Sequence, residues 1–453
     1  MKPDTRITDR FVDSLYALSR DAYSGPVLRQ ARLCLLDYLG VALAGARMLG
    51  DKNRRLWESL GSPEGGVTAI GLGRKTTQQA AALLNGFSSH VAELDDGERT
   101  AMMHPGAPIL SALLPAAEQD GLRGEDVLRG IVVGYEAALR TAGAMQPGLK
   151  DRGHHGTGIG GTLGAALGIA AALRFSREEM KAALSTAATS ASGLLKMIHG
   201  GSEMKPYNAA QAALNGLTAA RVAQAGFSGP ADVLDGDKGF LAIFSHDTFD
   251  PARLDRAEGD PLRIERIYRK PYAACRHCHA PIEAALKLRA AGLRPETVAG
   301  IDVRTYRWAV GGHDHTDAEG ASAAKMSIPV SLVLALVSGK AGFDAYTDEL
   351  LANPDVRALA QKVRVISDDA LSALVPEKRA AMVEVTLVSG ERRTERVEYP
   401  KGEPENPISD DEGRDKFRSL SLYGGKTEAE TDEILACVQD VEHALSRLYP
   451  LLS

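Results

Sequence analysis

One stretch of the chain reads Asp151-Arg152-Gly153-His154-His155-Gly156-Thr157-Gly158-Ile159-Gly160-Gly161-Thr162-Leu163-Gly164, with two adjacent histidines between an arginine and a run of glycines. A long segment of small apolar residues follows it. A glycine-rich loop of this kind brings backbone and imidazole groups close to a small bound molecule. We therefore predict a reactive loop that leads directly into a buried, closely packed helix.

Part of this stretch, Gly156-Thr157-Gly158-Ile159-Gly160-Gly161, matches the G-x-G-x-x-G pattern of dinucleotide-binding loops. That motif requires a hydrophobic strand before it and an acidic residue about 20 positions after it. The preceding residues, Gly148-Leu149-Lys150-Asp151-Arg152, do not have a strand pattern, and no acid is suitably placed in a later strand. We predict that the glycines allow close helix packing and do not bind a nucleotide.

The composition is that of a globular protein with room for two or three domains. The 453 residues are 44% hydrophobic and 25% charged, and the formal net charge is -6, which argues against nucleic acid or an anionic membrane as a partner. The four cysteines are scattered, which favours a reducing compartment. The N-terminus has no apolar signal region, and no run reaches the length of a transmembrane helix. We expect a cytoplasmic protein.

The two halves of the sequence differ in their periodicity. Helix start signals dominate the first half, as in Ser24-Gly25-Pro26, at Thr76 or Thr77, and in the capping box Ser176-Arg177-Glu178-Glu179. Short, often alternating and β-branched runs appear later, at residues 262–268, 298–308, 363–367 and 382–388, the last forming a predicted hairpin with 394–399. We predict a mainly α protein, with a large all-helical domain from residues 1–260 and 401–453 and a smaller α+β lid domain, residues 261–400, inserted between them.

The run Cys275-Arg276-His277-Cys278-His279 matches the attachment pattern of c-type haem, and Cys-x-x-Cys can be half of a zinc site. Haem attachment requires export, and a structural zinc needs a second pair of ligands, whereas the other cysteines stand alone. The residues favour instead an anion pocket lined by Lys270, Arg276 and His279, with the cysteines as packing. We predict no metal and no cofactor. The run His313-Asp314-His315 is typical of a solvated turn and stays unassigned.

Four polar loops lie between apolar segments, each with a basic or titratable group beside glycine or proline. They are residues 93–104, residues 152–155, the loop that ends at Lys205, and residues 270–279. Histidine exchanges protons near neutral pH, and lysine can hold a carboxylate or supply a proton. The sequence contains no serine elbow, Walker loop or H-E-x-x-H motif. This inventory favours metal-free acid–base chemistry on a small polycarboxylate.

A series of short motifs follows in order across nearly the whole chain. These motifs are Leu36-Asp37-Tyr38-Leu39-Gly40, Asn85-Gly86 with His90, Asp95-Asp96 leading to His104-Pro105, Gly134-Tyr135-Glu136, Arg152-Gly153-His154-His155-Gly156-Thr157, Lys205, Asn215-Gly216 before Gly226-Phe227, Lys270-Pro271-Tyr272 through Cys275-Arg276 to His279, Lys325-Met326-Ser327-Ile328-Pro329, and Lys401-Gly402 with Asn406-Pro407. In them the chain resembles the MmgE/PrpD family, which includes 2-methylcitrate dehydratase, cis-aconitate decarboxylase and iminodisuccinate epimerase.

The resemblance implies a helical first domain that is completed by the C-terminal helices, and an α+β lid. It also implies a homodimer with a metal-free active site between the domains, around a small di- or tricarboxylate. The catalytic residues that we expect are His104, His155 and Lys205. The substrate-binding residues that we expect are Glu93, Asp95, Lys270, Arg276 and His279.

Two departures from the family pattern affect the expected reaction. The acidic run Glu93-Leu94-Asp95-Asp96-Gly97 stands where the family usually has Asp-Phe-Asp-Asp-Thr, and the loop to His104 is one residue longer. Val330 stands where the family often has tyrosine. Both changes touch groups attributed to the decarboxylases, so decarboxylation of cis-aconitate is the least favoured activity. We predict a hydro-lyase of the 2-methylcitrate dehydratase type, with an iminodisuccinate-type epimerase as the alternative and a non-catalytic carboxylate-binding protein as the alternative from another class.

Overall fold

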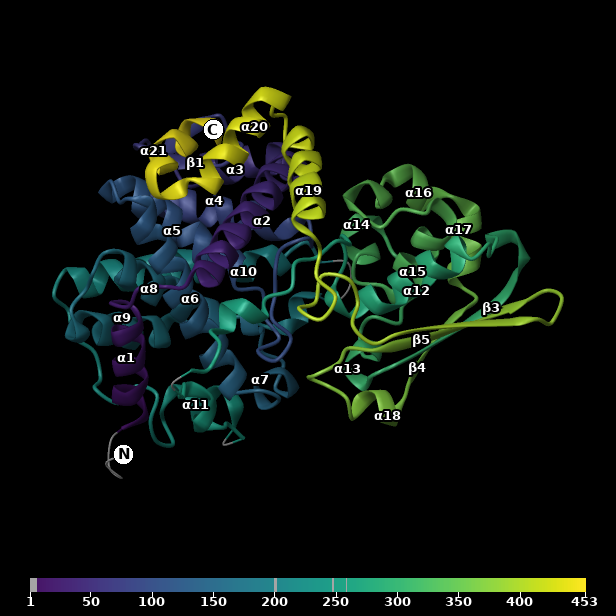
Figure 1. Ribbon diagram of the computed structural model, residues 1–453, viewed down its shortest axis with the longest axis horizontal. Coiled ribbons are helices and arrows are strands. Elements are labelled where there is room, and N and C mark those ends of the chain that lie inside the picture. Colours follow the sequence, from purple (N-terminus) through teal and green to yellow (C-terminus); the bar gives the residue numbers. More distant parts are fainter. Residues whose placement is uncertain (1–5, 199–201, 247, 258) are drawn as a thin grey trace.

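A computed structural model describes residues 6–198, 202–246, 248–257 and 259–453 (Figure 1). The first five residues and part of the predicted loop before Lys205, residues 199–201, lie outside the described residues. Among those described, no single helix is both long and apolar enough to cross a membrane. Two bent helix pairs pass the same test by length and composition only: Gly25–Leu49 with Asp51–Ser59, and Ile328–Ser338 with Phe343–Ala352.

The first domain consists mainly of helices, to which one short hairpin is added. Its helices are α1 (Ile7–Leu18), α2 (Gly25–Leu49), α3 (Asp51–Ser59), α4 (Gln78–Val91), α5 (Gly106–Asp120), α6 (Gly124–Ala144), α7 (Gly148–Asp151), α8 (Gly156–Ala172), α9 (Arg177–Ser190), α10 (Lys205–Gln224), α11 (Phe240–Ser245), α19 (Asp410–Tyr423), α20 (Glu428–Gln439) and α21 (Val441–Leu451). Strands β1 (Val67–Ala69) and β2 (Arg74–Thr76) pair antiparallel.

The predicted helix starts are confirmed. Helix α2 begins at Gly25 directly after Ser24, and the Thr77 side chain accepts a hydrogen bond from the Ala80 backbone nitrogen at the start of α4. The capping box at Ser176 is formed in full, since its side chain and that of Glu179 each bind the other residue's backbone nitrogen. These caps satisfy backbone donors that the first helical turn leaves open.

Helix α8 lies at the centre of the first domain, and all its residues are buried. Its glycines face α6 closely: a Cβ atom on Gly164 would lie 2.7 Å from the Gly134 carbonyl oxygen, and one on Gly168 would lie 2.8 Å from the Gly130 carbonyl oxygen. The predicted packing role of the glycines is therefore confirmed. A helix, α7, precedes the glycines where a dinucleotide-binding loop would need a strand.

The contact between α6 and α8 predicts opposite effects for two substitutions on α6. Gly134→Ala should lower the free energy of unfolding by about 1–3 kcal/mol, because its Cβ would lie 2.9 Å from the Gly164 carbonyl oxygen. Gly143→Ala meets no atom within 4 Å and should be neutral or stabilise the helix by up to about 1 kcal/mol. Chemical unfolding followed by circular dichroism tests both. Equal effects would contradict the packing role of Gly134.

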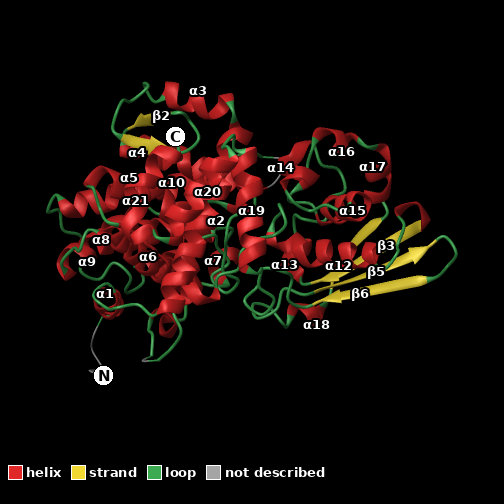
Figure 2. Cartoon of the chain, turned by 45° about the horizontal axis from the view of Figure 1, so that its top comes forward, coloured by secondary structure: helices red, strands yellow, loops and turns green. Residues whose placement is uncertain are grey.

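The lid domain combines helices with a four-stranded sheet, whose strands lie in the order β4-β3-β5-β6 (Figure 2). Strand β3 pairs parallel with β4 and antiparallel with β5, and β5 pairs antiparallel with β6, which confirms the predicted hairpin. The strands are β3 (Val298–Thr305), β4 (Val363–Ser367), β5 (Ala381–Leu387) and β6 (Arg392–Val397). The helices are α12 (His279–Ala290), α13 (Arg307–Val310), α14 (Gly320–Ala324), α15 (Ile328–Ser338), α16 (Asp348–Ala352), α17 (Pro354–Ala360) and α18 (Asp369–Ser372).

The strand predicted at residues 262–268 is wrong. Residues Arg263–Arg266 form a short 3-10 helix, and Ile264 packs in the core of the first domain. Only Tyr268 pairs in β fashion, through an isolated bridge to Gly97 among the described residues. The apolar periodicity of this segment therefore reflects burial against helices, because the segment has no neighbouring strand to extend.

The C-terminal helices return to the first domain, where α19 lies beside α2 and α21 packs on α6 (Figure 1). The Lys416 ammonium on α19 donates to Asp37 Oδ1 on α2 and to the Leu94 carbonyl oxygen, both at 2.7 Å. The mainly α fold with a small α+β part is confirmed, whereas the boundaries near residues 260 and 400 stay predictions. The return of the chain ties the polar loop at residues 93–104 to the helical core.

Candidate active site

A cavity of about 170 Å³ lies between the two domains. Its described lining contains histidines and cations but no aspartate or glutamate. The titratable groups in this wall are His104, Lys150, His154, His155, Lys205, Cys275, Arg276, His277, His313 and Arg379, with Tyr268 beside them. A small cationic chamber of this size suits a small polyanion and is too small for a dinucleotide. The predicted residues His104, His155, Lys205 and Arg276 therefore share one chamber.

The His104 ring is held as a neutral base. Its Nδ1 lies 2.6 Å from the Asp96 carbonyl oxygen, which can only accept, so Nδ1 carries the proton and Nε2 has a free lone pair. Burial, with the charges of Lys270 and Lys205, holds the pKa of His104 well below its usual range. Its backbone nitrogen donates to Thr157 Oγ1 at the start of α8. This ring can therefore take a proton from a substrate carbon.

The His155 ring is held in the opposite tautomer. It stands at the start of α8, and its Nδ1 lies 3.0 Å from the Asn208 amide nitrogen. The same amide nitrogen donates to the Leu194 carbonyl oxygen at 3.3 Å, so it is the donor toward His155 and the ring proton lies on Nε2. Burial, with the Lys205 charge, holds the pKa of His155 well below its usual range. This ring can therefore donate a hydrogen bond to a substrate oxygen.

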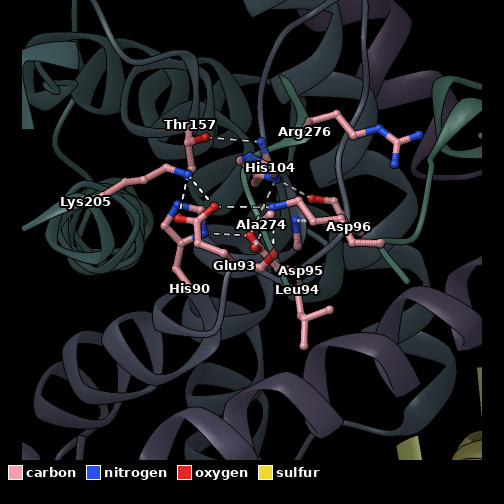
Figure 3. A network of polar contacts seen from close by, with 12 residues as sticks. His90, Glu93, Leu94, Asp95, Asp96, His104, Thr157, Lys205, Ala274 and Arg276 are labelled. Atoms are coloured by element: carbon pink, nitrogen blue, oxygen red, sulfur yellow. Dashed lines mark hydrogen bonds and ion pairs between the residues drawn. The ribbon is translucent and has the colours of Figure 1, made fainter. Parts of the chain in front are cut away.

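A buried carboxylate holds the two predicted lysines. Glu93 lies 2.6 Å from Lys205 Nζ through each of its oxygens and 3.4 Å from Lys270 Nζ (Figure 3). Burial alone would raise the pKa of Glu93, but the charges of Lys205 and Lys270 outweigh it and hold that pKa well below the usual range. Glu93 and Lys270 lie behind the cavity wall, whereas Lys205 reaches the cavity. The predicted roles of Glu93 and Lys270 in binding substrate stay predictions.

His90 is a residue of this site to which the sequence assigned no role. Its Nδ1 lies 2.7 Å from Asp95 Oδ2, and its ring centroid lies 5.2 Å from that of His104 and 6.3 Å from that of His155. Its Nε2 is buried and has no partner among the described residues. Asp95 therefore supports histidines from behind the wall, and its Oδ2 also lies 3.7 Å from His104 Nδ1. The motif Asn85-Gly86 with His90 was the signal in the sequence that could have identified this residue.

The predicted pair Arg276 and His279 lies at the lid side of the site. Arg276 Nε and Nη2 donate to Glu403 Oε1 at 3.1 and 2.7 Å, and its Nη1 lies 2.7 Å from His279 Nδ1. His279 is fully buried and donates from Nε2 to the Ala274 carbonyl oxygen, so it does not line the cavity. Glu403 neutralises Arg276, and no local pattern in the sequence pointed to Glu403. A role of this pair in binding substrate stays a prediction.

Three side chains of the lid could hold a soft divalent metal. The ligand atoms of Cys275, His277 and His313 lie within 4.8 Å of one another. His313 is buried in the cavity wall, with Nδ1 2.7 Å from the Met326 carbonyl oxygen, so the expectation of a solvated turn is wrong for this residue. Both ring nitrogens of His277 are already engaged, because Nε2 lies 3.1 Å from Lys150 Nζ and Nδ1 lies 2.6 Å from the Tyr306 hydroxyl. A metal would have to displace one of these partners in the presence of the positive charges of Arg379 and Lys205. The predicted absence of a metal stays a prediction, and elemental analysis of the purified protein tests it.

Two domain models of one protein family match the two parts of the chain. Residues 9–252 match the MmgE/PrpD N-terminal domain, and residues 272–440 match the MmgE/PrpD C-terminal domain. The chain is 28% identical to the cis-aconitate decarboxylase-like protein oryM of Aspergillus oryzae, over 96% of this chain and 98% of that protein. It is 28% identical to a cis-aconitate decarboxylase of Aspergillus terreus (89% of this chain, 87% of that protein) and 24% identical to the mitochondrial 2-methylcitrate dehydratase of Yarrowia lipolytica (96% and 87%).

Proposed function

The chain belongs to the MmgE/PrpD family, and from that premise we propose that it is a lyase that removes a proton α to a carboxylate of a small di- or tricarboxylate. The favoured reaction is elimination of water, as in a 2-methylcitrate dehydratase. The observation that carries this proposal is the pair of buried neutral histidines, His104 and His155, in opposite tautomers within one cationic cavity.

Elimination of water needs a base for the C–H bond and an acid for the departing hydroxyl. In this scheme His104 Nε2 acts as the base: it takes the α-proton, and the electron pair of the C–H bond becomes the new C=C bond. The ring then gains a positive charge, which the Asp95 carboxylate at 3.7 Å stabilises. Lys205 supplies a proton to the departing hydroxyl, which leaves as water. Solvent then carries the α-proton from His104 to Lys205, which restores both groups.

His155 has a different role in this scheme. A neutral imidazole is too weak an acid to give up its proton readily, but its Nε2–H can donate a hydrogen bond to negative charge that develops on a substrate oxygen. The Asn208 amide fixes this orientation because it occupies Nδ1. His155 therefore stabilises the carboxylate beside the carbon that loses its proton.

Decarboxylation, which the sequence alone ranked last, becomes the second candidate, because several relatives are named cis-aconitate decarboxylase. That reaction breaks a C–C bond and requires a proton donor for the carbon, whereas it needs no base for a C–H bond. The free lone pair on His104 supports elimination instead. Epimerisation requires two groups on opposite faces of one carbon and comes third.

Proton NMR of the protein with citrate, 2-methylcitrate, cis-aconitate and iminodisuccinate in D₂O tests the proposal. We expect an alkene product from a hydroxytricarboxylate, or addition of water to the corresponding alkene in the reverse direction. Loss of one carboxylate from cis-aconitate would establish the second candidate. Deuterium incorporation without alkene would indicate an epimerase. No change in any compound would favour a carboxylate-binding protein. The homodimer that the family resemblance implies is proposed as well, and light scattering of the purified chain tests it.

A further inference from the structure

Two cations in the wall of the cavity lack an acidic partner. Lys150 lies on α7 and Arg379 lies in the lid just before β5, and both line the cavity that His104 and His155 line. Within the described part of the chain, neither forms an ion pair within 4 Å, whereas Lys205 and Arg276 in the same wall are paired with glutamates. Arg379 is buried and Lys150 is half-buried. A cation that is removed from water without an ion-pair partner is costly, which points to an anionic ligand as its partner.

The contacts of Lys150 orient its ammonium group without neutralising it. Its Nζ lies 3.1 Å from His277 Nε2, and since an ammonium only donates, this ring nitrogen is the acceptor. The His277 ring proton therefore lies on Nδ1 and is donated to the Tyr306 hydroxyl, 2.6 Å away. The ammonium also lies 5.5 Å from the centre of the Trp308 ring. Further ammonium hydrogens remain for a ligand in the cavity.

Arg379 is similarly held by one neutral contact. Its Nη2 donates to the Arg99 carbonyl oxygen at 2.8 Å, and the residue is 7% exposed. No other hydrogen bond of its guanidinium is made within the described residues. Burial, with the repulsive positive charge of Arg379, lowers the pKa of Lys150 to about 8, and both side chains line the same cavity. An anion between them would relieve this repulsion.

We propose that Lys150 and Arg379 form a second anion subsite, which binds a substrate carboxylate remote from the carbon that reacts. This inference rests on the proposed function, since it assigns that function a substrate with at least two carboxylates. The subsite joins the domains, because Lys150 belongs to the helical domain and Arg379 to the lid. It therefore selects polycarboxylates over monocarboxylates of similar size.

Binding of tricarballylate tests the subsite without requiring turnover, because this tricarboxylate has neither a hydroxyl to eliminate nor a double bond. Lys150→Met and Arg379→Gln should each weaken its binding in isothermal titration calorimetry by about 10- to 100-fold, as expected for loss of a hydrogen-bonded charge. Butyrate binding should change little in both variants. Arg379→Lys keeps the charge and should retain more of the affinity than Arg379→Gln.

The matched control is Lys378→Gln, which removes the neighbouring positive charge outside the cavity, where it pairs with Glu398. It should bind tricarballylate as the unsubstituted protein does, and circular dichroism of each variant checks folding. Equal affinity of all variants, or no binding by the unsubstituted protein, would overturn the subsite. Binding that depends on Lys150 and Arg379, without turnover of any compound in the NMR panel, would support the subsite and remove the proposed lyase activity.

Discussion

Replacing His104 by asparagine is expected to lower kcat by about 10²- to 10⁴-fold while the fold is retained. The asparagine amide nitrogen can occupy the place of Nδ1 and keep the hydrogen bond to the Asp96 carbonyl oxygen. The lone pair on Nε2, which takes the substrate proton in the proposed reaction, is lost. Steady-state kinetics with the substrate found by NMR measures the effect, and thermal unfolding checks the fold.

The pH profile gives an independent signature of His104. Because its pKa lies well below its usual value, the ring is unprotonated at neutral pH, and kcat/KM should stay level through the usual titration range of histidine and fall only at more acidic pH. The charged or titratable groups around it are His90, Asp95, Asp96, Lys205 and Lys270. The residual activity of His104→Asn should lack this acidic decline. A kcat within threefold of the unsubstituted enzyme would contradict the role of His104 as base, and the exposed His443→Asn serves as the control.

Glu93→Ala is expected to lower the free energy of unfolding by about 3–5 kcal/mol. This change removes the carboxylate between Lys205 and Lys270 and leaves two buried ammonium groups without their main partner. Activity should fall as well, because Lys205 loses the contact that places it in the cavity wall. Chemical unfolding measures the stability, and kcat measured per folded molecule separates the two effects.

Two further variants test the explanation for Glu93. Glu203→Ala breaks an ion pair with Lys52 whose side chains are both more than half exposed, and it should cost about 1 kcal/mol or less. The double variant Glu93→Ala with Lys205→Met removes one of the unpaired buried charges. It should lose less stability than the sum of the losses in the two single variants. Strict additivity, or an equal loss from Glu203→Ala, would show that the buried charges are not the cause.

Local sequence signals were sufficient to predict a segment wherever its structure depends only on nearby residues. The capping box at Ser176 and the alternating pattern of β5 need only nearby residues, and both are formed as predicted. The failure at residues 262–268 has the opposite cause, because a strand needs a partner that lies elsewhere in the chain. The β1–β2 hairpin was not predicted for a different reason: each strand is only three residues long, which is too short to show an alternating pattern.

The sequence by itself determined the helical frame, the glycine contact of α8 and the residue types of the site. It could not determine which nitrogen of each histidine carries the proton. The Asp96 carbonyl oxygen decides this for His104, and the Asn208 amide decides it for His155. Tertiary structure also decided that Glu93 and Asp95 support the wall from behind and that Lys150 and Arg379 meet in one cavity. Charge and hydrogen-bond direction depend on distances between groups far apart in the chain, and only folding sets those distances.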